Sequence, residues 1–113
     1  MNRDRLHLRH ILEAIAAIEE FTDAGHAGFC SDRKTQSAVI RQLEIIGEAV
    51  KHLSSELTAA ETAVPWRLIA GARDRLIQGY FQVDLDAVWA MVEQDLPVLR
   101  SNVLRIEAAL TDV

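Results

Sequence analysis

The stretch LHLRHILEAIAAIEEF, residues 6–21, carries the clearest structural pattern in this 113-residue sequence. Its large apolar side chains recur at steps of three and four, which is the spacing of one face of an amphipathic helix: Leu8, Ile11, Leu12, Ile15, Ile18 and Phe21. The pattern predicts a first helix over roughly Asp4 to Thr22. Residues 23–31 contain two glycines that interrupt the period, and they predict a loop.

The same reasoning predicts a second helix after this loop. Asp32 is a suitable N-cap, because its carboxylate can accept a backbone N–H hydrogen bond, and the helix continues to about Leu53. Its apolar face is formed by Val39, Leu43, Ile46, Val50 and Leu53. Gly47 costs this helix about 1 kcal/mol of propensity relative to alanine, so we expect another element to pack closely against it.

The second half of the chain predicts two more helices. The linker from Ser54 to Val64 is polar and predicts only a short helical turn around residues 59–62. Pro65 is favoured in a first helical turn, and this third helix is expected to run to a break at Gly79. Asp84 or Asp86 then caps the last helix, which ends near Leu110 and should be kinked by Pro97. No strand pattern is present, so we predict an all-α, antiparallel bundle of four to five helices forming a single domain over residues 1–113.

Composition narrows the class of protein further. The net charge of −5 argues against a general nucleic-acid coat but permits a local basic site. Cys30 is the single cysteine, which excludes an internal disulfide and agrees with a reducing cytoplasm. No apolar run approaches about 20 residues and the first residues lack a signal-peptide pattern, so we expect a cytoplasmic protein without a membrane span.

Residues 73–80, RDRLIQGY, are the strongest candidates for a functional site. Arg73 and Arg75 contribute two guanidiniums, and from Trp66 to Gln82 three arginines stand against one aspartate, a local net charge of +2. A fixed cation beside polar side chains suits contact with a phosphate. The alternative is a structural role, in which Arg73 forms an ion pair with an acidic residue such as Glu44 or Glu48. Such exposed ion pairs are common in proteins.

Several segments together resemble the HepT-like family of HEPN proteins, over nearly the whole chain and in the family's order. They are Asp32-Arg33-Lys34-Thr35-Gln36, Leu43-Glu44-Ile45-Ile46-Gly47-Glu48-Ala49, Pro65-Trp66-Arg67, Arg73-Asp74-Arg75-Leu76-Ile77, Gly79-Tyr80-Phe81 and Asp95-Leu96-Pro97. The resemblance implies a HEPN-like bundle that dimerises, with two copies of the motif across a shared cleft. It also implies the toxin of a toxin–antitoxin pair, whose activity is metal-independent RNA cleavage without a cofactor and whose partner is a minimal nucleotidyltransferase, MntA.

The family's signature is an arginine, four variable residues, a histidine, one variable residue and a tyrosine. Arg73 and Tyr80 match it, but the histidine position is Gln78. In the family the histidine transfers protons and the arginine stabilises the phosphate. A glutamine amide can hydrogen-bond a phosphate but is neither an acid nor a base near pH 7, so cleavage should be impaired roughly 10²–10⁴-fold. The resemblance further implies that the antitoxin attaches AMP groups to Tyr80. We expect Asp74 to support Arg73, and Arg75 to be either a solvated charge or an RNA contact in the dimer cleft.

Two origins of Gln78 stay open: a natural residue in a degenerate binding module, or a substitution introduced so that a toxin can be expressed. Two other functions also compete with the ribonuclease. One is a non-catalytic helical dimer that binds a nucleotidyltransferase, and the other is a purely structural bundle.

The remaining candidate residues favour structural roles. His7 and His10 are three residues apart and could form a helical metal pair, but a four-ligand site needs more, and His26 and His52 have no matching spacing. We therefore expect no metal and assign the histidines to the surface. Trp66 and Trp89 fall within apolar patterns and should pack in the bundle.

Overall fold

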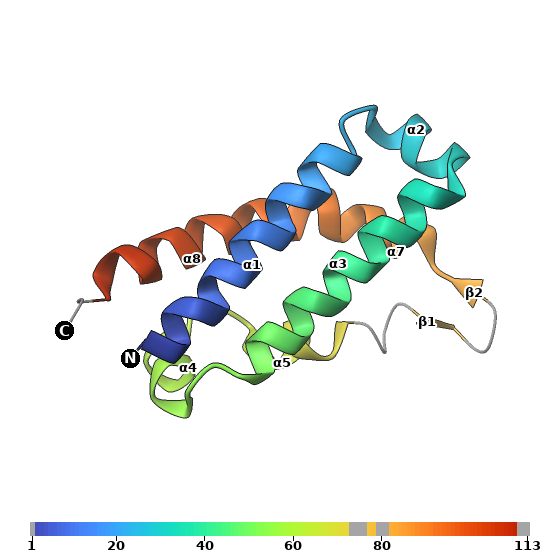
Figure 1. Ribbon diagram of the computed structural model, residues 1–113. Helices are drawn as coiled ribbons and strands as arrows, with labels where there is room; N and C mark the ends of the chain where they lie inside the picture. Colours follow the sequence, from blue (N-terminus) through green and yellow to red (C-terminus); the bar gives the residue numbers. More distant parts are fainter. Residues whose placement is uncertain (1, 73–76, 79–81, 111–113) are drawn as a thin grey trace.

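Three long helices form the body of the protein. The computed structural model describes residues 2–72, 77–78 and 82–110. Helices α1 (Asn2–Phe21) and α3 (Arg33–Lys51) lie side by side and run in opposite directions, and α8 (Leu96–Ala109) lies along α1 (Figure 1). The prediction of an all-α bundle with antiparallel helices is confirmed. No helix within the described residues has the length and the apolar content needed to cross a membrane.

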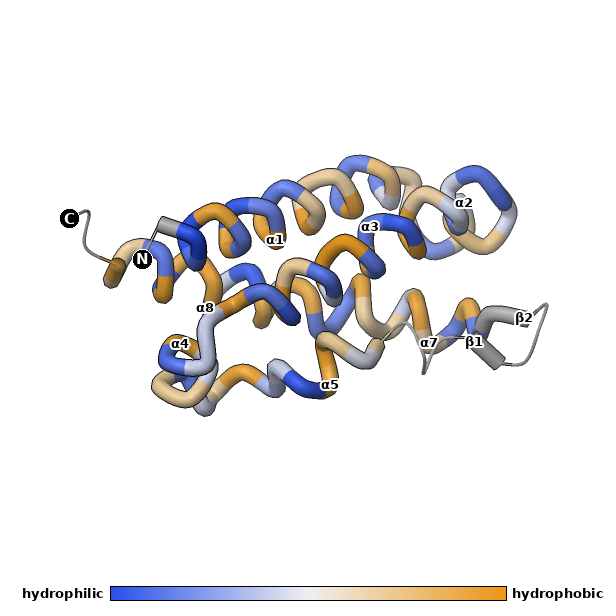
Figure 2. Tube along the Cα trace, turned by 60° about the horizontal axis from the view of Figure 1, so that its bottom comes forward, coloured by the Kyte–Doolittle hydropathy of each residue, from blue (hydrophilic) through white to orange (hydrophobic). Residues whose placement is uncertain are grey.

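The core lies between these helices and is built from the predicted apolar faces. The bands of hydrophobic and hydrophilic residues that alternate along α1 and α3 in Figure 2 reflect the helical repeat. Leu8, Ile11, Ile15 and Ile18 of α1 are completely buried. Val39, Leu43, Ile46 and Val50 of α3 and Leu96, Leu99, Val103 and Ile106 of α8 are buried against them. Of the predicted α1 face, only Phe21 at the helix end is exposed.

Helix α2 (Gly25–Ser31) occupies the stretch for which the sequence predicts a loop, so that prediction is wrong. Gly25 has a φ of +82°, a left-handed conformation that glycine adopts without strain, and it turns the chain out of α1. Phe29 is 1% exposed and anchors the helix in the core. The side chain of Gln36 donates to the Phe29 and Cys30 carbonyls at 2.9 and 3.1 Å. Burial and capping therefore outweigh the low helix propensity of the two glycines.

The helix starts follow from side-chain caps. The Asp32 carboxylate accepts a hydrogen bond from the Lys34 backbone N–H at 3.0 Å, as predicted for the start of α3. Ser54 caps α4 (Ser55–Ala60) by accepting from the Leu57 N–H at 3.2 Å. This cap places the linker helix earlier than the predicted turn at residues 59–62.

The predicted third helix is interrupted at Gly71. Helix α5 (Trp66–Ala70) follows Pro65 but ends at Ala70. Strands β1 (Ile77–Gln78) and β2 (Gln82–Val83) then pair antiparallel, with Ile77 opposite Val83 and Gln78 opposite Gln82. The prediction of helix up to Gly79 is therefore wrong at residues 77–78, where the opposed β-branched residues Ile77 and Val83 favour the strand pair. The predicted break at Gly79 lies outside the described residues.

The last predicted helix is interrupted just before Pro97. Helix α7 (Leu85–Ala90), capped by the Asp84 carboxylate, leads into the π-helical turn η1 (Met91–Asp95) and then into α8. The Leu96 N–H donates to the Met91 carbonyl, five residues back. Proline cannot donate a backbone hydrogen bond and clashes with the preceding turn, and a widened turn relieves both problems. The predicted irregularity at Pro97 is thus a π-helical turn.

Candidate functional site

The sequence-predicted motif follows directly on α5, and α5 is held firmly at both ends. Trp66 is buried, and its indole N–H donates to the Glu61 carbonyl at 3.0 Å. At the other end, a Cβ placed on Gly47 of α3 would lie 3.3 Å from the Ala70 carbonyl oxygen. The close packing predicted at Gly47 is therefore confirmed, and it fixes the point at which the chain enters the motif.

The motif itself is described only in part. Gln78 lies in β1, where its partner across the ladder is Gln82. Arg73, Asp74, Arg75 and Tyr80 lie outside the described residues. The predicted roles of these four residues, and the alternative ion pair between Arg73 and an acidic residue of α3, stay predictions.

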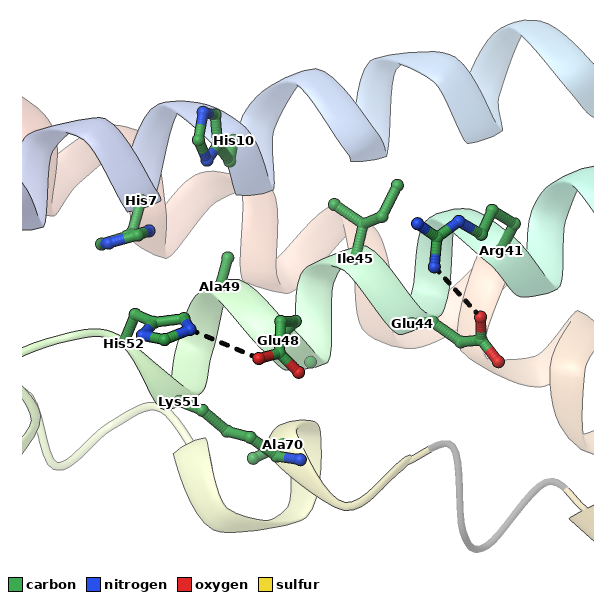
Figure 3. A pocket seen from close by; sticks show the side chains of 11 residues that line it. His7, His10, Arg41, Glu44, Ile45, Glu48, Ala49, Lys51, His52 and Ala70 are labelled. Carbon is green, nitrogen blue, oxygen red and sulfur yellow. Dashed lines mark hydrogen bonds and ion pairs between the residues drawn. The ribbon is translucent and has the colours of Figure 1, made fainter.

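A groove lies beside α5, between the first turns of α1 and the last turns of α3 (Figure 3). Its volume is about 600 Å³. We call it the histidine groove, and it is lined by His7, His10, Arg41, Glu44, Ile45, Gly47, Glu48, Ala49, Lys51, His52 and Ala70. The lining combines three imidazoles, two cations and two carboxylates, so its net charge is zero when the imidazoles are neutral.

The three histidines come together in space. The ring centroids of His7 and His52 are 5.2 Å apart and the rings are stacked, with 21° between their planes. His10 approaches His7 edge-on, with the centroids 5.9 Å apart. His52 Nε2 lies 3.3 Å from a carboxylate oxygen of Glu48, one turn earlier on α3. The predicted surface location is confirmed for His10 and His52, which are exposed, while His7 is partly buried. The antiparallel helices bring His52 beside His7, 45 positions earlier in the sequence, which local spacing does not indicate.

The charge state of the groove depends on pH. Burial lowers the pKa of His7 below its usual value, and the neighbouring His52, His10 and Arg3 lower it further, while Asp4 opposes them. His7 is therefore neutral at pH 7 in the free protein. Within the described residues, no three His, Cys, Asp or Glu side chains are arranged to hold a metal ion.

The ion pairs of the groove involve the acidic residues suggested as partners of the motif. Arg41 Nη1 lies 3.4 Å from Glu44 Oε1. Glu48 faces His52, as described above. Glu44 is thus paired with Arg41 on α3, and Glu48 with His52, the residue directly after α3 (Figure 3).

The other candidates from the sequence have structural roles. Trp89 is partly buried and packs on Phe29 and His26, with ring centroids 5.3 and 5.1 Å apart. With the burial of Trp66, this confirms that both tryptophans pack in the bundle. Cys30 is exposed, and its sulfur lies 3.3 Å from His26 Nε2.

Comparison with known proteins identifies the family. The family model described as "Ribonuclease HepT-like" matches residues 11–106. The chain belongs to the HepT-like ribonuclease family. It is 46% identical over 97 residues to "Probable ribonuclease HepT" of Thermococcus cleftensis, which covers 85% of this chain and 88% of that protein. It is 39% identical over 107 residues to "Putative RNase TTE0752" of Caldanaerobacter subterraneus subsp. tengcongensis, covering 94% of this chain and 96% of that protein.

A third relative is longer. The chain is 44% identical over 108 residues, 94% of its length, to "Gamma-glutamylcyclotransferase and putative RNase MJ0434" of Methanocaldococcus jannaschii, but it spans only 49% of that protein. No solved structure gives a significant match. The HepT-like match includes residues 73–80 and His52, whereas His7 and His10 precede it.

Proposed function

We propose that this HepT-like protein is the toxin of a type VII toxin–antitoxin pair and a metal-independent RNA endonuclease whose activity is impaired by Gln78. The observation that carries the proposal is the family match across residues 11–106, together with Arg73 and Tyr80 at their signature positions. RNA is the substrate that the family implies. The protein acts in the cytoplasm, where its RNA targets are.

Arg73 stabilises the negative charge that develops on the phosphate, because its planar guanidinium matches two phosphate oxygens and stays ionised at every physiological pH. The second requirement is a group that removes the proton of the 2′-hydroxyl and one that protonates the leaving oxygen. Histidine meets this requirement near neutral pH and glutamine does not. In its present form the protein therefore binds RNA and cleaves it very slowly or not at all.

Tyr80 is the regulatory residue in this proposal. A minimal nucleotidyltransferase of the MntA type transfers AMP from ATP to its hydroxyl, which loses its proton, and pyrophosphate leaves. The added anionic phosphates occupy the position that the RNA backbone needs beside Arg73. Incubating the two proteins with ATP should add the mass of AMP to this chain, and Tyr80→Phe should prevent the addition. A mass increase that persists in Tyr80→Phe would move the modification to another residue.

Expression in cells tests the proposal as a whole. Gln78→His should arrest growth, co-expression of the nucleotidyltransferase should relieve the arrest, and Arg73→Ala in the Gln78→His background should abolish it. Arg73→Ala should leave the helical circular dichroism spectrum unchanged, because this proposal gives Arg73 a role in RNA cleavage and none in folding. A variant that unfolds would instead support the structural ion-pair role of Arg73.

The second candidate is a non-catalytic dimer that binds the nucleotidyltransferase, and Gln78 is the observation that favours it. This candidate predicts that Gln78→His is harmless to cells while the two proteins still co-purify. The toxin proposal predicts both the association and the growth arrest.

A further inference from the structure

We propose that the histidine groove binds the single-stranded RNA next to the cleavage motif, with bases stacking on its imidazole rings and phosphates contacting Arg41 and Lys51. The inference rests on the proposed ribonuclease function and adds a substrate-binding site to it. It also makes RNA binding dependent on pH.

The position of the groove links it to the motif. Ala70, the last residue of α5, lines the groove and precedes Arg73 by three residues, a length of chain that spans at most about 11 Å. Arg41 and Lys51 are ten residues apart on α3, which places them about 15 Å apart along the helix axis. Because stacked bases advance about 3.4 Å per nucleotide, this distance corresponds to roughly four nucleotides.

The chemistry of the lining suits an unpaired strand. Single-stranded RNA is recognised through bases that stack on flat side chains, histidine among them. The stacked pair of His7 and His52 presents such rings on the groove wall, where His7 extends from α1 toward the end of α3 (Figure 3). Among the described residues, none forms a hydrogen bond or an ion pair with the ring nitrogens of His7 or His10. Those nitrogens are therefore available to a ligand.

The charge balance explains how binding responds to pH. With neutral imidazoles, the two cations of the groove are offset by Glu44 and Glu48, so the groove attracts a polyanion only weakly. The charged and titratable groups around His7 are Arg3, Asp4 and His10 on α1, Glu48 and Lys51 on α3, and His52 directly after α3. Protonated imidazoles repel one another in the free protein, but a bound phosphate stabilises them, so RNA binding takes up protons.

Binding of a short fluorescent oligouridine by the unsubstituted protein, followed by fluorescence anisotropy, tests the proposal. We expect roughly tenfold tighter binding at about pH 5.5 than at about pH 7.5, the effect of one gained charge-assisted hydrogen bond. Replacing both His7 and His52 with alanine should weaken this pH dependence and leave only the contribution of His10, whereas His26→Ala, a histidine outside the groove, should keep it in full. Equal pH dependence in the double variant and in the protein with His26→Ala would overturn the proposal.

Salt dependence provides a second readout. Lys51→Gln should lower the slope of log affinity against log salt by about 0.7, the value for one phosphate contact of a single strand. Arg100→Gln on α8 is the matched control and should leave the slope unchanged, and circular dichroism should show that both variants fold. An unchanged slope in Lys51→Gln would contradict the phosphate contact. Uridine monophosphate that binds as tightly as the oligomer would assign the groove to a free nucleotide instead.

The outcome is separable from that of the ribonuclease proposal. If Gln78→His does not cleave RNA but binding still depends on His7, His52 and Lys51, the groove is an RNA site and the catalytic proposal fails. If Gln78→His cleaves RNA and the groove variants bind it as well as the parent protein does, the groove proposal fails alone. A groove variant that changes the molecular mass in solution instead of RNA binding would assign this face to a protein contact.

Discussion

Replacing Asp4 with alanine should destabilise the protein by about 3 kcal/mol. Asp4 lies in the first turn of α1, yet its side chain is buried and hydrogen-bonded. Asp4 is only 7% exposed, and its two carboxylate oxygens accept hydrogen bonds from Ser54, one from the backbone N–H at 2.8 Å and one from the hydroxyl at 2.6 Å. These bonds join the start of α1 to the junction between α3 and α4. The Ser54 hydroxyl in turn accepts from the Leu57 N–H, so the carboxylate also orients the cap of α4.

The magnitude follows from the two bonds. A hydrogen bond to a charged group contributes about 1.5–3 kcal/mol, and the two share one carboxylate, so we take about 3 kcal/mol for their combined loss. Asp4→Asn keeps one acceptor oxygen and should lose about half as much. Ser54→Ala should lose about 2 kcal/mol, from one bond to Asp4 and one helix cap.

Urea denaturation followed by circular dichroism measures these differences, provided that the m value is unchanged. The double variant Asp4→Ala, Ser54→Ala should be less destabilised than the sum of the single variants, with a coupling of about 1 kcal/mol or more. Strictly additive effects, or a loss below about 1 kcal/mol in Asp4→Ala, would refute the claim that this buried carboxylate joins the helices.

Three further predictions concern packing, pH and assembly. Gly47→Ala should lower the melting temperature in thermal denaturation despite the better helix propensity of alanine, because the new Cβ would lie 3.3 Å from the Ala70 carbonyl oxygen. Gly71→Ala is the control and should be tolerated, because its new Cβ would lie 3.5 Å from the nearest atom, the Arg67 carbonyl oxygen. The contribution of His7 to the free energy of unfolding should be full above about pH 6.5 and should fall as the pH drops through its lowered pKa, since burial first and then His52 disfavour its charged form. In urea denaturation at a series of pH values, His7→Gln should flatten this profile. Light scattering at micromolar concentration should give the mass of a dimer or a larger assembly, and a monomer mass would contradict the shared cleft.

The long helices were predictable because their buried residues recur with the regular period of an α-helix. The apolar faces of α1, α3 and α8 repeat over several turns, and the N-cap at Asp32 has the local chemistry that starts a helix. The prediction failed where tertiary contacts decide a short segment. Phe29 holds α2 in a stretch rich in glycine, and the strand pair at Ile77 is too short to produce an alternating pattern.

The sequence likewise predicts one part of the candidate site and not the other. The motif from Arg73 to Tyr80 was found through a family resemblance, which spacing alone could not have supplied. The histidine groove is not visible in the local sequence pattern, because His7 and His52 are 45 residues apart and only the packing of two helices brings them together. The antiparallel bundle already predicted from the sequence contained the necessary signal, since it brings the start of α1 beside the end of α3.

Cleavage of single-stranded RNA by the purified Gln78→His protein in the presence of EDTA tests the central claim most directly. It should exceed cleavage by the unsubstituted protein by roughly 10²–10⁴-fold, resist EDTA and depend on a group that titrates near neutral pH. Arg73→Ala in the same background should abolish it. Robust cleavage by the Gln78 protein that is unaffected by Arg73→Ala, or an inactive Gln78→His protein that still binds RNA, would contradict the proposed catalytic roles.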